Sequence, residues 1–165
     1  MLDAGILKED DRVELIEGEI VAMSPIGSPH SGCVIKLLAL LQRALSSDAV
    51  LVNVQNPLHL SEYSEPQPDI SVLRERQDFY TASHPTAADV VFLIEVSDSS
   101  LIYDQRIKLP LYARSGIAEA WLVDLVNQVV EVHTSPRESV YEQVERFAGT
   151  AVLPRIGVPA SEILF

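Results

Sequence analysis

A single carboxylate lies within the most apolar run of the sequence. The run is VVFLIEV at 90–96, and the carboxylate is Glu95. Such a run predicts a buried central strand, where an unpaired charge is costly unless a cation or hydrogen-bond donors compensate it. Asp69 follows Pro68 and begins a second apolar run, DISVL at 69–73. Two acidic side chains that converge at strand ends would form a site for a hard divalent cation such as Mg²⁺, which typically takes one or two carboxylates.

A lysine in the following segment could complete such a site. The residues after Glu95 predict a helix over about 103–114, on which Asp104 and Lys108 share one face with Tyr112. If that face points at the strand ends, the lysine can neutralise charge that develops on a metal-bound phosphate. The alternative is a solvated ion pair between Asp104 and Lys108, worth a few tenths of a kcal/mol.

The N-terminal part of the chain predicts a hairpin and a helix. Residues 13–23 form two short apolar runs around Glu17-Gly18, a pair that suits a tight turn. Ser28 is expected to cap the helix, with Pro29 at its first position. The helix has apolar residues at helical spacing, which predicts one buried face: Val34, Leu37, Leu38, Leu41 and Leu45.

The remaining segments predict mostly strands. Pro110 should kink the helix at 103–114 or end its first half, because proline removes a backbone donor, and Gly116 should stop it. The expected strands lie at 49–55 and 69–73, both covered on two faces, at 90–96, at 118–125 and 128–134 as a hairpin, and at about 139–147. The order of elements predicts an α/β or α+β fold on one mixed sheet.

Composition limits the classes of function. The 165 residues suit a single domain, 1–165, that can bury a sizeable core. Twelve Lys and Arg against 24 Asp and Glu give a net charge of −12, which disfavours stable nonspecific binding to nucleic acid. The cationic residues Arg74, Arg76, Arg106, Lys108 and Arg114 nevertheless fall close together in the sequence, so a local basic site is conceivable.

Cysteine usage and hydropathy predict the compartment. The single cysteine, Cys33, cannot form an internal bridge, so we expect a reducing, cytoplasmic environment and a core position for Cys33. The start, MLDAGILKEDD, reaches acidic residues before any signal-like run, and no apolar stretch approaches the roughly 20 residues that span a bilayer. We therefore expect a soluble protein with no membrane partner.

Other common catalytic patterns are absent from the sequence. It contains no Walker loop, no Cys/His zinc pattern, and no G-x-S-x-G elbow before the serines at 97, 99 and 100. The acidic residues and the lysine remain the candidates for chemistry.

Five ordered segments resemble one known family. They are RVELIEGEIVAMSPIGSPH, NPLHLSEYSEPQPD, PQPDISVL, VVFLIEVSDSS and YDQRIKLPLYARSGIAEAWLVD. Together they resemble the Uma-type family of putative restriction endonucleases, a branch of the PD-(D/E)XK phosphodiesterase superfamily. The resemblance covers nearly the whole chain, and it implies a restriction-endonuclease-like mixed β-sheet flanked by helices.

The resemblance also assigns the central residues. The PD of the superfamily falls on Pro68-Asp69, and its second acid falls on Glu95. The usual E-x-K pattern would place a lysine at position 97, where this chain has Ser97. The resemblance implies that the lysine has moved to the following helix, which matches Lys108.

Further residues match family positions with less defined roles. Asp104 belongs to the same pattern, and His30, at the start of the first helix, could be a base, a substrate contact or local polar decoration. The additional upstream acid of the superfamily is either Glu14 or Glu19, one on each arm of the first hairpin. Either could instead be a strand charge that faces solvent.

The resemblance implies Mg²⁺-dependent hydrolysis of DNA, with Mn²⁺ as an alternative ion. Asp69 and Glu95 would be the metal ligands, and Lys108 would stabilise charge on the phosphoryl oxygens. One rival hypothesis is a nucleic-acid-binding or regulatory module that keeps the fold without cutting. Another is an interaction protein in which Glu95 is only a buried polar anchor. A homodimer is the expected assembly, since a two-fold axis suits cutting both strands of a duplex.

Overall fold

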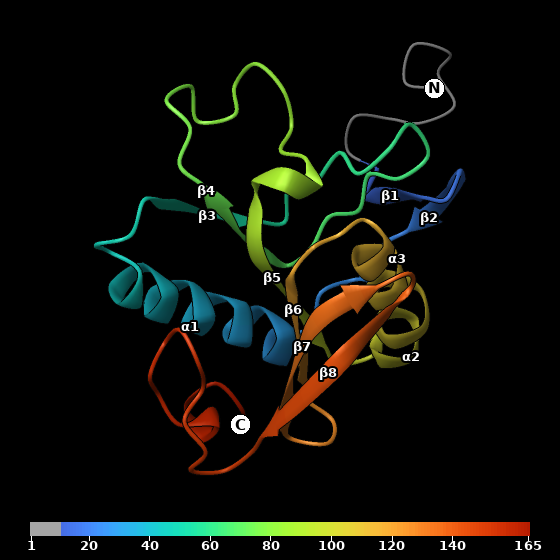
Figure 1. Ribbon diagram of the computed structural model, residues 1–165. Coiled ribbons are helices and arrows are strands. Elements are labelled where there is room, and N and C mark those ends of the chain that lie inside the picture. The colour runs from blue at the N-terminus through green and yellow to red at the C-terminus, as the bar shows by residue number, and fades with distance from the viewer. Residues whose placement is uncertain (1–10) are drawn as a thin grey trace.

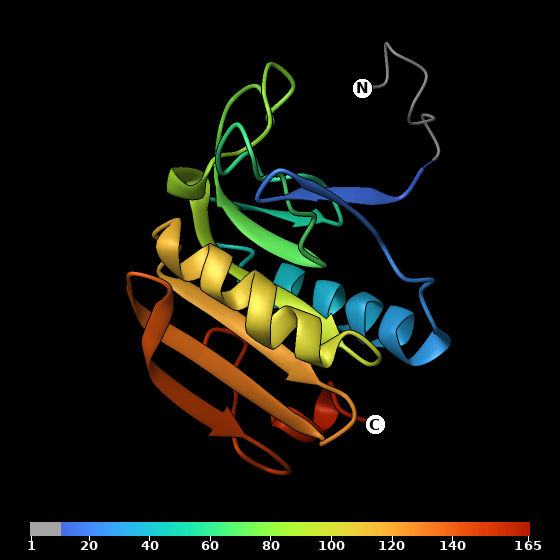
Figure 2. The same cartoon turned by 90° about the vertical axis from the view of Figure 1, so that its right-hand side faces the viewer.

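The computed structural model describes residues 11–165, which form a mixed sheet with helices on both faces (Figures 1 and 2). The sheet has six strands in the order β3-β4-β5-β6-β7-β8, and only β5 and β6 pair in parallel among these neighbours. The strands are β3 (Val50–Val54), β4 (Ile70–Arg74), β5 (Val90–Ser97), β6 (Glu119–Asp124), β7 (Val129–Arg137) and β8 (Val140–Phe147). The predicted α+β class and mixed sheet are confirmed.

The first hairpin forms a small sheet of its own. It consists of β1 (Val13–Ile16) and β2 (Glu19–Ala22), and Glu17 and Gly18 both have positive φ angles, as a tight turn requires. The prediction of a hairpin is confirmed, but the prediction of one sheet for the whole chain is wrong. The reason is that β1 pairs with β2 and with a loop instead of with a strand of the six-stranded sheet. In that loop the Glu65 amide donates to the Leu15 carbonyl at 2.7 Å.

One long helix, α1 (Ser28–Ala44), covers one face of the sheet (Figure 1). Its N-cap is Gly27 rather than Ser28, because Ser28 is already helical and makes no capping bond with its side chain. Pro29 is the second helical residue rather than the first, but it still lies in the first turn, where a missing amide donor costs nothing.

A helix in three segments covers the opposite face (Figure 2). The segments are α2 (Leu101–Tyr103), a π-helical turn (Asp104–Lys108) and α3 (Leu109–Arg114). In the π-turn the Leu109 amide donates to the Asp104 carbonyl, five residues back, and Pro110 then lies in the first turn of α3, where it needs no donor. Pro110 thus divides the helix, as predicted. This helix is also the crossover that connects the parallel strands β5 and β6.

The edge strands are less buried than the central ones. All five residues of β3 are half-buried, so the expectation that this strand is covered on both faces is wrong. An edge strand has a neighbour on one side only, whereas β4 is buried over four of its five residues. At the other side of the sheet, β6, β7 and β8 form the predicted meander.

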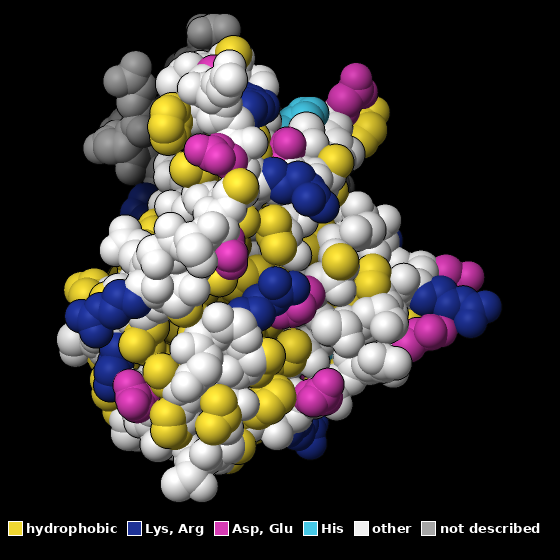
Figure 3. Space-filling model, turned by 60° about the vertical axis from the view of Figure 1, so that its left-hand side comes forward, with side chains coloured by type: hydrophobic (Ala, Val, Ile, Leu, Met, Phe, Trp, Pro, Cys, Tyr) yellow, Lys and Arg dark blue, Asp and Glu magenta, His cyan; other side chains and the backbone are white. Residues whose placement is uncertain are grey.

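Cationic side chains do not gather into one surface. Arg76 pairs with Asp78, Arg114 pairs with Glu17, and Lys108 is buried. On the face shown in Figure 3, lysine and arginine side chains lie in separate patches, several of them beside acidic ones. Three of the five cationic residues that lie close together in the sequence are therefore paired with an acid or buried, and they do not form a local basic site.

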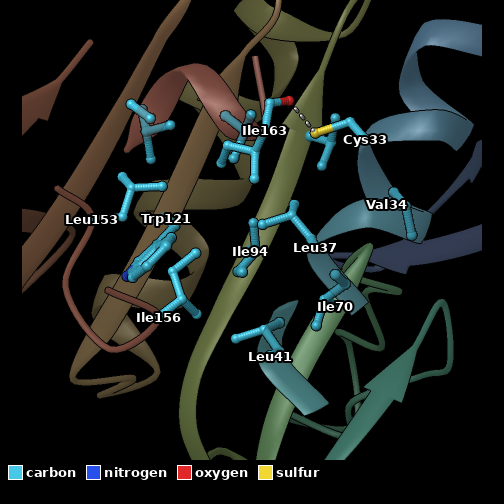
Figure 4. Packing of buried hydrophobic residues seen from close by; sticks show 14 of the residues in the cluster. Cys33, Val34, Leu37, Leu41, Ile70, Ile94, Trp121, Leu153, Ile156 and Ile163 are labelled. Carbon is cyan, nitrogen blue, oxygen red and sulfur yellow. Dashed lines mark hydrogen bonds between the residues drawn. The ribbon is translucent and has the colours of Figure 1, made fainter. Parts of the chain in front are cut away.

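The main hydrophobic core lies between α1 and the sheet (Figure 4). Leu37 and Leu41 from the helix pack against a layer of strand residues that includes Ile70, Ile94 and Trp121. The Cys33 thiol donates to the Ile163 carbonyl in this core, and burial raises its pKa to about 12. The core position expected for Cys33 is confirmed.

No helix within residues 11–165 is long and apolar enough to cross a membrane. The expectation that the chain starts without a signal-like run concerns residues 1–10, which lie outside the described part of the chain.

Candidate active site

The two acids singled out in the sequence lie side by side at strand ends. Strands β4 and β5 are antiparallel with Ile70 opposite Ile94, so the position just before β4 adjoins the end of β5. This register places Asp69 across from Glu95, and both side chains are buried. The convergence expected from the sequence is therefore present.

Three donors hold Asp69 in place. His30 Nε2 and the Val96 amide both lie 2.9 Å from Asp69 Oδ2, and Gln55 Nε2 lies 3.1 Å from Oδ1. Burial alone would raise the pKa of Asp69, but these hydrogen bonds and the nearby imidazole outweigh it and hold the pKa below its usual value. Asp69 is therefore a carboxylate, and the pKa of His30 is raised, chiefly by its hydrogen bond to Asp69.

Lys108 points into the acidic cluster rather than toward solvent. Its Nζ atom lies 2.7 Å from Glu95 Oε1 and 2.9 Å from Glu14 Oε1, and the residue is only 4% exposed. Burial alone would lower the pKa of Lys108, but the two carboxylates outweigh it and raise the pKa, so the amine stays charged. The alternative of a solvated pair with Asp104 is wrong for this lysine.

Asp104 is buried along with Lys108 in the π-helical turn. Asp104 Oδ2 accepts hydrogen bonds from the hydroxyls of Ser97 and Ser100, both at 2.6 Å. Burial raises the pKa of Asp104 despite these bonds. Ser97 stands where the superfamily's usual pattern would place a lysine, and here its hydroxyl fixes the acid of the helix instead.

Glu95 is the acid of the cluster whose pKa is raised far above its usual value. Its Oε1 atom also accepts a hydrogen bond from the Tyr112 hydroxyl. Burial raises the pKa of Glu95 to about 8, and Lys108 offsets that effect only in part because Asp104, Asp69 and Glu14 act in the same direction as burial. The cluster therefore has more acidic groups than its one lysine can neutralise.

These groups line an open pocket of about 330 Å³. Two buried polar atoms of pocket residues, His30 Nδ1 and Tyr103 Oη, have no hydrogen-bond partner within the described residues. Buried polar atoms in folded proteins almost always have a partner, so these two atoms are positions where a water molecule or a polar ligand would bind.

Comparison with known proteins identifies the family. The model of the Uma2 family, described as "Putative restriction endonuclease", matches residues 2–162. The chain belongs to the Uma2 family. Its fold is similar to a crystal structure from Anabaena variabilis, described as a putative nuclease of DUF820, with a TM-score of 0.75 and 16% identity over 98% of this chain and 94% of that one. Among curated proteins, no match was found.

Of the two candidate upstream acids of this Uma2 member, only Glu14 lies in the pocket. Glu14 Oε1 accepts the Gln67 amide at 2.7 Å as well as Lys108. Glu19 is exposed on β2 and is not among the residues that line the pocket. The difference arises because β1 alternates between half-buried and buried positions, whereas β2 faces mainly outward.

Several pocket residues were missed by reasoning from the sequence, and three of them are polar side chains next to the acidic cluster. Gln55 follows strand β3 directly, Gln67 precedes the Pro-Asp pair, and Tyr103 precedes Asp104. The only signal for Gln67 and Tyr103 is their position next to recognised motif residues. Gln55 has no such signal, since its role depends on the pairing of β3 with β4.

The donor set of the pocket fits a hydrated Mg²⁺ ion. Within residues 11–165, no three His, Cys, Asp or Glu side chains are placed to hold a metal on their own. Mg²⁺ usually needs only one or two carboxylates, because water and substrate phosphates complete its octahedron. Asp69 and Glu95 both line the pocket and are the carboxylates that would hold such an ion.

Proposed function

We propose that this Uma2 protein is a Mg²⁺-dependent endonuclease that hydrolyses phosphodiester bonds of DNA. The observation that carries the proposal is the buried cluster in which Glu95 and Glu14 share Lys108 beside Asp69, at the wall of an open pocket. Burying several carboxylates around one lysine costs stability, and such a cost is typical of functional sites. Membership of a family described as "Putative restriction endonuclease" supports the same reaction class.

The residues would divide the work as follows. Asp69 and Glu95 would hold the metal ion, which supplies a Lewis acid for the phosphoryl oxygen and lowers the pKa of a water molecule. Lys108 keeps its positive charge through Glu95 and Glu14 and would stabilise negative charge on the phosphoryl group. His30, through Asp69, would set the orientation of that carboxylate.

One observation weighs against the cutting of DNA and so favours the second function, a nucleic-acid-binding or regulatory module that does not cut, in its regulatory form. The net charge is −12, and the cationic residues that cluster in the sequence do not form one basic surface. Electrostatic attraction to DNA is then weak at physiological salt. The two functions share the fold and differ in whether phosphodiester bonds are broken.

A cleavage assay separates them. We expect the protein to cut plasmid or single-stranded DNA with Mg²⁺ or Mn²⁺ and not with EDTA, and Glu95→Gln should abolish cutting. Glu131→Gln is the matched control, because Glu131 is also a buried acid but is held by Arg146 and His133 outside the pocket. Metal-independent cutting, or equal cutting by Glu95→Gln, would overturn the proposal, and binding without cutting would favour the second function.

We also propose that the acting assembly is a two-fold homodimer, since such symmetry matches the two strands of a duplex. Light scattering coupled to gel filtration gives the mass of the assembly directly. A monomer that still makes double-strand breaks would rule the dimer out.

A further inference from the structure

A second pocket, of about 410 Å³, lies outside the candidate active site. It is bounded by strand β3 and by the long loop between β4 and β5, which projects beyond the sheet in Figure 1. Its walls combine apolar side chains from the strands (Leu51 and Leu73), amides (Asn53 and Asn56) and rings from the loop (Phe79 and His84). Pockets of this size and mixed lining suit a small planar ligand.

The loop is held in one shape by an arginine clamp. Arg76 Nε and Nη2 donate to the two carboxylate oxygens of Asp78 at 2.6 and 3.1 Å, and Nη2 also donates to the Ser83 carbonyl at 3.1 Å. The guanidinium carbon lies 3.9 Å from the centre of the Tyr80 ring, whose hydroxyl donates to the Arg74 carbonyl. The loop is thus a built structure with many internal bonds.

The clamp forces two aromatic residues into an unfavourable backbone conformation. Phe79 has φ of 50° and Tyr80 has φ of 61°, in the left-handed region that is costly for any side chain other than glycine. The result is that Phe79 stands at the pocket with 67% of its surface exposed. A large apolar ring that is exposed on a strained backbone does not stabilise the folded state.

The two pockets meet at consecutive residues. Gln55 also has a positive φ, lines the candidate active site and donates to Asp69. The next residue, Asn56, lines the second pocket. The two pockets therefore adjoin one another in the sequence, at the end of β3.

We propose that the second pocket binds an unpaired nucleobase of the DNA strand, stacked on Phe79. This inference rests on the proposed function, since it names the form of the substrate. Aromatic rings stack on any base. The amides of Asn53 and Asn56 hydrogen-bond to each other, so stacking is the main contact that the pocket offers to a base. Arg76 is already engaged by Asp78 and by Tyr80, so the pocket suits the uncharged base rather than a phosphate.

The test uses a fluorescein-labelled single-stranded oligodeoxythymidylate at low salt, with Ca²⁺ in place of Mg²⁺ to suppress cutting. Phe79→Ala should weaken binding by roughly five-fold to 150-fold, the range that loss of one stacked base gives. Replacing successive thymidines by abasic sites should reveal one position that weakens binding to the native protein. At that position Phe79→Ala should add no further loss.

Two more variants control for folding and for exposure. Phe79→Gly should raise the melting temperature, because glycine adopts positive φ without strain, and yet bind the oligonucleotide as weakly as Phe79→Ala. Tyr63→Ala removes a ring that is 66% exposed and lies outside both pockets, so it should bind normally.

Cleavage of the same oligonucleotide with Mg²⁺ is scored separately. If the native protein cuts, but Phe79→Ala binds normally or no abasic position is singled out, the nucleobase site is wrong and the nuclease stands. If base-dependent binding through Phe79 is present without any cutting, the nucleobase site stands and the proposed nuclease function fails. Equal losses for Phe79→Ala and Tyr63→Ala would also overturn the site.

Discussion

The two faces of the central sheet differ in the type of side chain that they carry. The same strand, β5, sends Phe92, Ile94 and Val96 into the apolar core under α1 and turns Glu95 and Ser97 toward the segmented helix. The face under α1 is closed mainly by apolar side chains (Figure 4). The other face also has apolar residues, but its end holds acids and a lysine that depend on each other. The face under α1 therefore contributes mainly to stability, whereas the opposite face holds the candidate active site at the expense of stability.

Loss of Lys108 should have the largest effect on this contrast. Lys108→Met keeps the length of the side chain but leaves Glu14 and Glu95 without their shared cation. We expect cleavage to fall by orders of magnitude, measured as a rate on plasmid DNA, because the lysine is proposed to act on the phosphoryl oxygens. Breaking a buried pair by removing one partner should also cost about 3–5 kcal/mol in urea unfolding. An unchanged cleavage rate would show that Lys108 is only structural.

The apolar face should respond in stability alone. Leu37→Ala should lower the free energy of unfolding by about 2–5 kcal/mol, since Leu37 is fully buried in the core. Cleavage per folded molecule should stay at the native value. Ile35→Ala is the control, because Ile35 is exposed on the same helix and should change stability by less than about 0.5 kcal/mol. A large loss of specific activity in Leu37→Ala would contradict the division between the faces.

Metal should stabilise the charged face and leave the apolar face unaffected. At a Mn²⁺ concentration of 100 times its dissociation constant, linkage predicts a gain of about 2.7 kcal/mol, seen as a rise in melting temperature. Asp69→Asn should abolish this gain, whereas Leu37→Ala, although less stable, should keep it. If millimolar Mn²⁺ does not shift the melting of the native protein, the metal site loses its main support.

The contrast also explains which parts could be predicted from the sequence. Glu95 stands out because a carboxylate in an apolar run is rare, and antiparallel pairing of short strands then brings Asp69 to it. The choice between Glu14 and Glu19 could not be made, because the orientation of the hairpin depends on the distant bond between Glu65 and Leu15. Such long-range pairing leaves no local pattern in the sequence.

Local propensity was also insufficient at two helix positions. Ser28 is a favoured capping residue, yet it is already the first residue of the helix, and Gly27 is the N-cap. The π-turn before Pro110 follows from the missing proline donor together with burial of Asp104 and Lys108, and spacing alone predicts an ordinary i, i+4 helix there. The periodicity of the sequence correctly predicted which face of this helix is buried, but it did not predict the π-helical turn.

A pair of tyrosines tests the orphaned hydroxyl of the pocket. Tyr103→Phe removes a buried hydroxyl that has no partner within residues 11–165, so the free energy of unfolding should stay the same or rise slightly. Tyr141→Phe removes a hydroxyl that donates to the Ile117 carbonyl at 2.9 Å and should cost about 1 kcal/mol. Urea unfolding measures both. If Tyr103→Phe also lowers cleavage while Tyr141→Phe does not, the Tyr103 hydroxyl serves the substrate, and an equal loss of stability in both would show that it has a partner in the fold.

The smallest effect should come from a histidine outside the pocket, whose pKa shifts in the opposite direction from that of His30. Burial lowers the pKa of His133, and the bond to Glu131 cannot reverse this, because Glu131 is also held by Arg146 at 2.9 Å. A histidine with a lowered pKa stabilises the fold above its unfolded pKa of about 6.5 and loses that contribution as the pH falls through its folded pKa. His133→Gln, which can still donate to Glu131, should therefore lose less stability than the native protein as the pH is lowered from 7.5 toward 5. Melting temperatures of both proteins across this range, with EDTA present, measure the difference, and parallel curves would show that the titration of His133 is not shifted by folding.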